Sequence, residues 1–302
     1  MAEKFSEEII EAIPFEALEV NSILRYTIFT KKNDTYNIYL QRGKRFGMGE
    51  KTKLKSQRIE YVYIKQLSKE LFLEDVLKNI DKVENRVKSN DAMIGIYYDL
   101  LDLYIKDIFT KGLSKNSIDL IIKFLSKVVD LVLSSSSCST KLISIIEEHS
   151  TKYQHSMNVM VYSLILGKML SLKQDQLEVL SLGALFHDIA KIEKDFDEST
   201  HSTRGVEILN EYGIDDAVVK RIVLEHHEYL DGSGTPNALS ADEISRFSQI
   251  VTITNTFDNL CSSDRDNLST FEALKYMKSK MLSKLNETAL HSFIVLFKKQ
   301  RA

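Results

Sequence analysis

Proline occurs only at Pro14 and Pro236 in this chain of 302 residues. Proline removes a backbone donor and clashes with the preceding helical turn. The long stretch of chain without proline between these two positions therefore favours long, uninterrupted helices. From about Asp81 onward the spacing of the apolar residues also indicates helices, because these residues recur every three or four positions, as over residues 118–132. This pattern predicts helices at 92–109, 118–132, 153–170, 174–191, 202–212, 215–229 and 241–260.

The first part of the chain has a different pattern. Residues 23–29 are rich in β-branched and aromatic side chains, residues 36–40 alternate with period two, and residues 61–64 form a further short apolar run. These features predict strands, with a turn at 32–34, and a helix is predicted near 70–80. We therefore predict an α+β fold: a small β-rich domain at 1–85, a helical connector or the start of a bundle at 86–150, and an all-α helical bundle at 151–302.

Composition excludes several classes of protein. The net charge of −3 gives no general attraction to nucleic acid or to an anionic membrane surface. No apolar run approaches the roughly 20 residues of a membrane span, and the charged N-terminus does not resemble a secretory signal. Cys138 and Cys261 form no CxxC unit and are compatible with a reducing compartment. We predict a cytoplasmic protein with no membrane or nucleic-acid partner.

The basic residues between Arg42 and Arg58 are a candidate surface for phosphate or nucleic acid. They lack the clear interleaved aromatic residues of a stacking surface, so a solvated face is the favoured interpretation.

Five of the seven histidines lie between His155 and His227, and one of them directly precedes Asp188. Imidazole nitrogens bind metals, and this donor set suits Fe, Mn, Zn or Ni better than Ca or Mg. On a helix, His187 and Asp188 point about 100° apart and meet a metal only at the rim of a pocket. Lys191 follows on the same face, one turn along. Two cations about 3.5–4 Å apart that share Asp188 and a hydroxide would suit attack on phosphorus, with Lys191 offsetting charge on the phosphoryl oxygens.

These residues form an ordered set that resembles the HD-GYP subgroup of the HD phosphohydrolase superfamily, from about residue 153 to 265. LFHDIAK at 185–191 is similar to the LHDIGK of that family. HHE at 226–228, followed by DGSGTP at 231–236, is similar to HHE…DGSGYP. NTFD at 255–258 stands where the family has DVYD, and SDR at 263–265 ends that motif.

The resemblance implies a helical bundle with a metal centre, often of iron, that hydrolyses cyclic di-GMP to pGpG or GMP in bacterial signalling. By position, it implies seven metal ligands: His155, His187, Asp188, His201, His226, His227 and Asn255. It also makes Asp188 and Lys191 catalytic, and places Lys191, Thr235 and Arg265 at the substrate. Thr151 stands where the trinuclear branch has a glutamate, which favours two divalent metal ions over three.

The departures from the family pattern keep alternatives open. Thr235 replaces the tyrosine of GYP, and the neutral Asn255 replaces an aspartate ligand, for which Asp258 is a candidate to compensate. A catalytically weak or inactive domain that acts as a cyclic dinucleotide sensor or a protein-interaction scaffold is therefore the alternative function. A phosphohydrolase acting on another nucleotide is a third.

The N-terminal module resembles the small β-rich domains found ahead of HD-GYP domains in bacterial proteins. A regulatory or interaction role is predicted for it, with a GGDEF-type or other signalling protein as partner. The helices from about 92 to 133 are candidates for transmitting a signal or for pairing in a homodimer.

Overall fold

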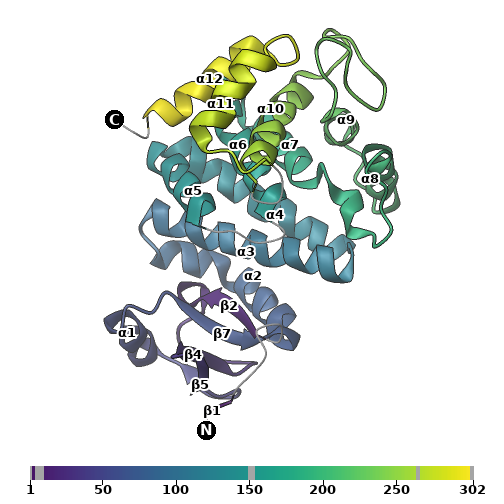
Figure 1. Cartoon of the computed structure of the whole chain (residues 1–302). Helices are drawn as coiled ribbons and strands as arrows, with labels where there is room; N and C mark the ends of the chain where they lie inside the picture. Colours follow the sequence, from purple (N-terminus) through teal and green to yellow (C-terminus); the bar gives the residue numbers. More distant parts are fainter. Residues whose placement is uncertain (1, 4–9, 149–153, 263–265, 300–302) are drawn as a thin grey trace. The chain divides into compact units, whose positions relative to one another are not determined.

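The computed structural model describes residues 2–3, 10–148, 154–262 and 266–299. The chain separates into two compact units, residues 1–100 and 101–302, and Figure 1 labels most of their helices and strands. The strands lie in the first unit and the second is helical, so the predicted α+β class is confirmed. Within the described ranges, no helix is both long and apolar enough to cross a membrane.

The first unit contains a five-stranded sheet in the order β1-β5-β4-β7-β2 and a two-stranded ribbon of β3 and β6. All the pairs are antiparallel. The strands are β1 (Ala2–Glu3), β2 (Ile10–Pro14), β3 (Ser22–Ile23), β4 (Ile28–Lys32), β5 (Thr35–Leu40), β6 (Arg45–Phe46) and β7 (Tyr61–Lys65). The helices are η2 (Phe15–Ala17), α1 (Met48–Ser56), η3 (Gln66–Ser68), α2 (Lys69–Arg86) and the start of α3 (Asn90–Lys111).

Local sequence accounts for the hairpin in the middle of this sheet. β4 and β5 pair with Lys32 opposite Thr35, which leaves a two-residue loop. Asn33 and Asp34 there have φ of 47° and 57°, and asparagine and aspartate tolerate this left-handed conformation best after glycine. Pro14 ends β2, which is an edge strand, so its missing N–H disrupts no central ladder.

The prediction of one strand over 23–29 is wrong in its bounds, because β3 ends at Ile23 and β4 begins at Ile28. Leu24 and Tyr26 in between are buried at 3% exposure each. Burial of these side chains in an irregular segment explains the apolar and aromatic composition without a strand.

The basic stretch is not wholly a solvated face. Lys51 on α1 is buried and pairs with Glu16, while Lys55, one turn later, is exposed and pairs with the same carboxylate.

The second unit is an all-α bundle. Its elements after α3 are α4 (Lys115–Ser134), α5 (Ser136–Glu148), α6 (Gln154–Met169), α7 (Gln174–Phe186), η4 (Ile189–Ile192), α8 (His201–Glu211), α9 (Ala217–Glu225), α10 (Arg246–Cys261), α11 (Thr270–Lys280) and α12 (Glu287–Lys299).

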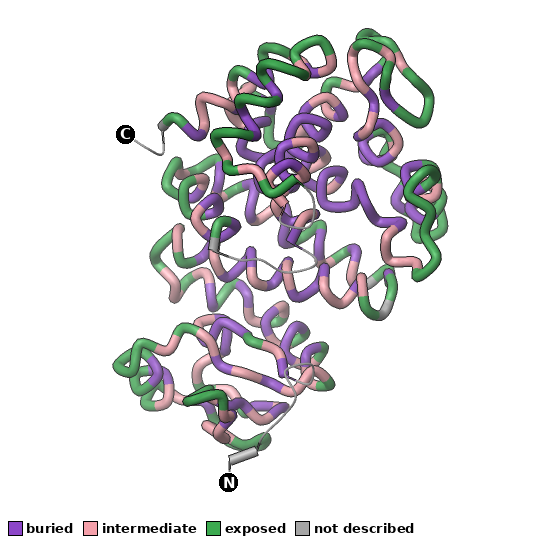
Figure 2. The backbone as a smooth tube through the Cα atoms, in the orientation of Figure 1, coloured by how far each residue is buried: buried purple, intermediate pink, exposed green. Residues whose placement is uncertain are grey.

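Helix α6 lies at the centre of this bundle. It contacts α4, α5, α7, α10 and α12. Most of its residues are buried on every side, as Figure 2 shows by colour, and a helix that is apolar all round belongs in a core. The first predicted ligand, His155, lies in the first turn of this central helix.

Candidate metal centre

Two helices of the bundle end at histidines. We predicted continuous helices over 174–191 and 215–229, and both predictions are wrong at the C-terminal end. Helix α7 ends at Phe186 and α9 at Glu225, so His187 and His226 are their C-cap residues. Asp188 has already left helical geometry, with φ −106° and ψ 24°. Because the last carbonyls of a helix carry partial negative charge, both ends favour a cation.

A close contact brings these two helix ends together. A Cβ atom at Gly183 would lie 2.5 Å from Cδ1 of Ile222, so α7 and α9 approach each other where glycine leaves room. Gly183 lies four residues before His187, and Ile222 lies four residues before His226. The two imidazole ring centroids are 5.0 Å apart. The glycine therefore allows α7 and α9 to approach closely, which places the rings of His187 and His226 next to each other.

The imidazole rings are held by their Nδ1 atoms. In His187, His201 and His226 this atom lies 2.7, 2.7 and 2.8 Å from the carbonyl oxygen of the residue three positions earlier. A carbonyl oxygen only accepts hydrogen bonds, so Nδ1 carries the proton and Nε2 presents a lone pair. The Nδ1 atom of His155 lies 2.7 Å from Oδ2 of Asp258, another acceptor.

The Nε2 atoms converge. His155 Nε2 lies 3.1 Å from His187 Nε2. His201 Nε2 lies 3.2 Å from Nε2 of both His226 and His227. Where Nδ1 holds the proton on both rings, two lone pairs face each other at this distance and repel unless positive charge lies between them. This is the arrangement of ligands around a cation.

Asp188 joins two groups of these nitrogens. Its Oδ2 lies 3.3 Å from His187 Nε2 and 3.6 Å from His155 Nε2, and its Oδ1 lies 3.3 Å from His201 Nε2. Oδ1 is buried and accepts no hydrogen bond from any described residue. A buried carboxylate oxygen without a donor is costly, so the site fits a cation. Asp188 belongs to two groups of side chains whose ligand atoms lie close enough together to hold a metal ion, called metal-sized groups below. One combines Asp188 with His201, His226 and His227, and the other combines Asp188 with His155 and His187.

Burial and neighbouring charges keep Asp188, His226 and His227 in their metal-binding forms. Burial raises the pKa of Asp188, but the groups around the carboxylate, which include the ammonium of Lys191, outweigh burial and hold that pKa well below its usual range. Burial lowers the pKa of His226 well below its usual value and that of His227 to about 4. Asp188 is therefore ionised and these two imidazoles are neutral near pH 7, as metal ligands must be.

The other predicted site residues lie at differing distances from the cluster. Lys191, in η4, is at the cluster, with its Nζ 2.7 Å from Oδ2 of Asp188. Thr235 is exposed, and its backbone N–H donates to the carbonyl of His227 at 3.2 Å. Arg265 and Thr151 lie outside the described residues.

Helix α10 contains Asn255 and Asp258, the two residues whose role as metal ligands the sequence left open. Asp258 contacts the Nδ1 side of His155, away from the converging nitrogens, and neither metal-sized group of the described residues includes it. Asn255 is buried, and its Oδ1 accepts a hydrogen bond from Asn259 at 2.9 Å. Its role as a ligand stays a prediction.

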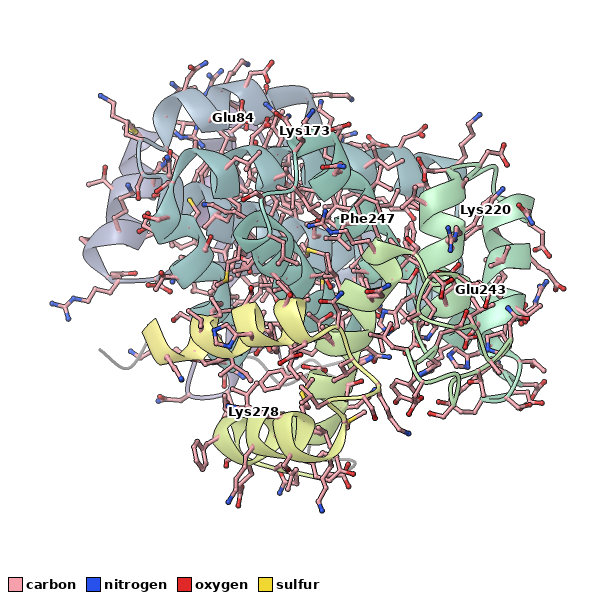
Figure 3. All side chains as sticks on the ribbon, turned by 90° about the horizontal axis from the view of Figure 1, so that it is seen from above. Glu84, Lys173, Lys220, Glu243, Phe247 and Lys278 are labelled. Carbon is pink, nitrogen blue, oxygen red and sulfur yellow. The ribbon has the colours of Figure 1, made fainter. Side chains whose placement is uncertain are left out.

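The DGSGTP loop folds back on the histidine pair, and sequence reasoning missed the residue that holds it. Glu228 is buried, and its two oxygens accept from the backbone N–H groups of Asn237 at 2.6 Å and Leu239 at 3.0 Å. A Cβ atom at Gly234 would collide with the backbone of residues 227–229, so only glycine fits there. The motif HHE followed by DGSG was the available signal. The loop continues past Glu243, labelled in Figure 3, to the start of α10.

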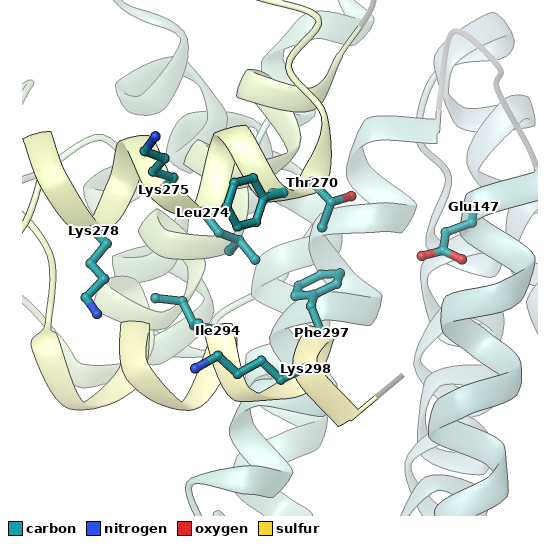
Figure 4. Close-up of a pocket in the computed structure, with 9 residues that line it drawn as sticks. Glu147, Thr270, Leu274, Lys275, Lys278, Ile294, Phe297 and Lys298 are labelled. Atoms are coloured by element: carbon teal, nitrogen blue, oxygen red, sulfur yellow. The ribbon is translucent and has the colours of Figure 1, made fainter. Parts of the chain in front are cut away.

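Among the cavities lined by described residues of this unit, two bear on the site. One of about 440 Å³ is lined by His201 itself, with Phe196, Thr200 and Arg204 among its walls, so it adjoins the cluster. A larger one of about 620 Å³ lies along α11 and α12, with Leu274 and Phe297 among its walls (Figure 4). No predicted ligand lines the larger cavity. Of these two cavities, the smaller is the one with a predicted ligand among its lining residues.

Known proteins resemble the chain in sequence and in fold. A family model described as "HD domain" matches residues 138–288, half of the chain. The 3'3'-cGAMP-specific phosphodiesterase 2 of Vibrio cholerae serotype O1 is 29% identical over 178 residues, which are 53% of this chain. The chain spans only 32% of that relative's length.

The solved structure of Bd1817, a HDG"Y"P protein from Bdellovibrio bacteriovorus, has the same fold, with a TM-score of 0.68 at 19% identity. The match covers 96% of this chain and 99% of that one. The chain belongs to the HD domain family. Its motifs resemble those of the HD-GYP subgroup, with Thr235 in place of the tyrosine of GYP.

Proposed function

We propose that the protein is a metal-dependent phosphodiesterase that hydrolyses a cyclic dinucleotide, and that its centre holds two divalent cations. The observation that carries this proposal is the convergence of four imidazole Nε2 atoms on the two oxygens of Asp188, with Nε2 of His227 3.2 Å from Nε2 of His201. Iron is the metal that the HD-GYP resemblance favours, and the donors also suit Mn, Zn or Ni.

When bound, a pair of divalent cations supplies an activated water and neutralises charge on the phosphoryl group. The residues of the chain supply the frame for this chemistry. Asp188 belongs to both groups, so it would be the ligand common to both cations. Lys191 Nζ, partly exposed beside Oδ2 of Asp188, stabilises the negative charge that builds up on the phosphoryl oxygens during attack. Hydrolysis breaks one phosphorus–oxygen ester bond and yields a linear dinucleotide.

Two substrates are to be compared. The HD-GYP resemblance favours cyclic di-GMP. The Vibrio cholerae relative is named for 3'3'-cGAMP, which supports the class of cyclic dinucleotides more than either member. The cavity beside His201, with the exposed ring of Phe196, supports binding of part of such a ligand near the cluster.

The test is to incubate metal-loaded protein with cyclic di-GMP and, separately, with 3'3'-cGAMP, and to follow linear products by chromatography. Asp188→Asn should abolish product formation. The matched control is Asp175→Asn, which makes the same change at an exposed position of α7. Absence of product from both substrates, with two equivalents of metal bound, would refute the enzymatic proposal.

The alternative function predicts a different outcome of the same experiment. If the neutral Asn255 leaves the domain a sensor or scaffold, metal-loaded protein should bind a cyclic dinucleotide tightly and release no product.

A further inference from the structure

The five histidines of the cluster are not held alike. Three of them are anchored by a carbonyl oxygen of the preceding turn of their own chain segment. His155 instead meets a carboxylate on another helix, with its Nδ1 2.7 Å from Oδ2 of Asp258, 103 residues away in sequence. Among the ring nitrogens with described partners, this is the one Nδ1 atom paired with a negatively charged group.

Asp258 is itself held in place. Its other oxygen, Oδ1, accepts a hydrogen bond from Asn158 Nδ2 at 2.8 Å. The side-chain oxygen of Asn158 in turn accepts from Gln154 Nε2 at 3.1 Å. Since His155 and Asn158 are three residues apart on α6, they share a face of that helix and hold both oxygens of Asp258 from one side. Asp258 is 9% exposed, so water competes little for these bonds.

The two metal-sized groups are unequal. One combines Asp188 with three imidazoles, and the other combines it with two, those of His155 and His187. The poorer group is the one that contains the carboxylate-backed histidine. A carboxylate behind a ligating imidazole fixes its tautomer and orientation and raises the donor strength of Nε2.

We infer that Asp258 is a positioning residue for the poorer group, and that the two cation positions fill in sequence, the three-histidine position first. Asp258 acts through His155 rather than as a ligand. It strengthens the position that has the fewest imidazoles. This inference rests on the two-cation centre of the proposed function, but not on turnover.

The experiment is a calorimetric titration of the full-length, metal-free protein with Mn²⁺, and then with Zn²⁺. The unchanged protein should show two binding steps of different affinity. Asp258→Asn, which keeps the shape and removes the charge, should weaken the second step about 10- to 100-fold and leave the first unchanged. Asp242→Asn, at an exposed loop position, is the charge-matched control and should alter neither step.

Two further variants assign the steps. His155→Ala should remove the second step alone, and His227→Ala should weaken the first. Asn158→Ala removes one of the two bonds that hold Asp258, so it should shift the second step in the same direction by a smaller factor. Electron paramagnetic resonance gives an independent readout. Two equivalents of Mn²⁺ should give an exchange-coupled pair in the unchanged protein and mainly single-ion signals in Asp258→Asn.

The outcomes separate this inference from the proposed function. Two resolved steps, with the second sensitive to Asp258→Asn, support the inference even if no cyclic dinucleotide is hydrolysed. A titration in which Asp258→Asn matches the unchanged protein, or in which it weakens both steps equally, overturns the inference whatever the activity.

Discussion

Each unit of the chain holds a buried or half-buried polar cluster, and the two are built in opposite ways. In the first unit, the carboxylate of Glu16 lies between two ammonium groups, with Lys51 Nζ at 2.5 Å and Lys55 Nζ at 2.8 Å. In the second unit, Asp188 has one ammonium neighbour, Lys191, and otherwise faces imidazole nitrogens that are themselves acceptors. The first cluster contains donors for its acceptors. In the second, Lys191 donates to Oδ2 of Asp188, but Oδ1 has no donor among the described residues.

This difference separates a structural cluster from a functional one. Oppositely charged side chains that neutralise each other need no bound ligand. Removal of one of them lowers the stability of the fold. A set of acceptors directed at one point is complete only when a cation joins it, so its free energy depends on a ligand. The following changes should therefore act on one cluster and leave the other unaffected.

The largest effect is expected from Asp188→Ala, because this residue belongs to both metal-sized groups. Loss of an outer-sphere partner already costs about 10- to 100-fold in metal affinity or activity, so loss of the shared ligand should cost more than 100-fold. Elemental analysis of the purified variant, alongside product chromatography, measures both. Glu16→Gln should retain the full metal content, and a loss of metal there would contradict the separation of the two clusters.

Removal of metal with a chelator should come next in size. A ligand that binds only the folded state stabilises it by about 2.7 kcal/mol at 100 times its Kd. For a unit of this size that corresponds to a fall in Tm of about 5–10 °C on chelation. Differential scanning calorimetry suits this chain, which has no tryptophan. Hydrogen exchange should then rise in peptides of α7 to α9 and stay constant in peptides of the sheet.

Gly234→Ala should loosen the loop that packs on the histidine pair. The added methyl group meets the backbone of residues 227–229, which cannot move aside as a flexible side chain would. Overpacking of this kind costs about 1–3 kcal/mol. Metal affinity should fall with stability, because His227 belongs to the displaced segment. Thr235→Ala, at the exposed neighbouring position, is the matched control, and equal effects of the two variants would contradict the close fit at Gly234.

Glu16→Gln tests the self-sufficient cluster. It leaves the buried ammonium of Lys51 without a counter-charge, which should lower the free energy of unfolding by about 1–3 kcal/mol. Urea unfolding followed by circular dichroism measures the change. A variant as stable as the unchanged protein would show that the ion pairs of Glu16 contribute nothing.

The smallest effect is a pH dependence of the same group. Burial raises the pKa of Glu16, but the bonds and charges of Lys51 and Lys55 outweigh it, so the pKa lies below the ordinary 4.5. The unfolded chain then binds a proton at higher pH than the folded one. The stabilisation is therefore fully present above pH 4.5 and is lost as pH falls through the lowered pKa. The stability difference between the unchanged protein and Glu16→Gln should shrink on acidification over this range; a constant difference would contradict it.

The identities of the cluster residues were predictable from the sequence, but their geometry was not. Histidine and aspartate at the spacings of His187-Asp188 and His226-His227 indicate ligands whatever the backbone does. The end of α7 was missed because Ile189 and Ala190 continue the apolar pattern beyond it. The break at Asp188 becomes apparent only once Nδ1 of His187 has met the carbonyl three residues earlier.

Other features could not be predicted from the sequence because they depend on contacts between residues that are far apart in the chain. The position of Asp258 behind His155 depends on a bond across 103 residues, and spacing alone cannot distinguish it from a direct ligand. Strand β2 pairs with β7, about fifty residues later, and its own five residues have no alternating pattern strong enough to indicate a strand. Burial of Lys51 likewise depends on the distant Glu16.

Because Gly183 contacts Ile222, the distance between His187 and His226 depends on the distance between α7 and α9. Each of these residues lies one turn before a capping histidine, so any group that pushes α7 away from α9 also moves Nε2 of His187 away from Nε2 of His226. Because these two histidines belong to different groups, the separation of the two proposed cation positions would then depend on a residue that touches no ligand. A single methyl group at position 183 would move those two positions apart.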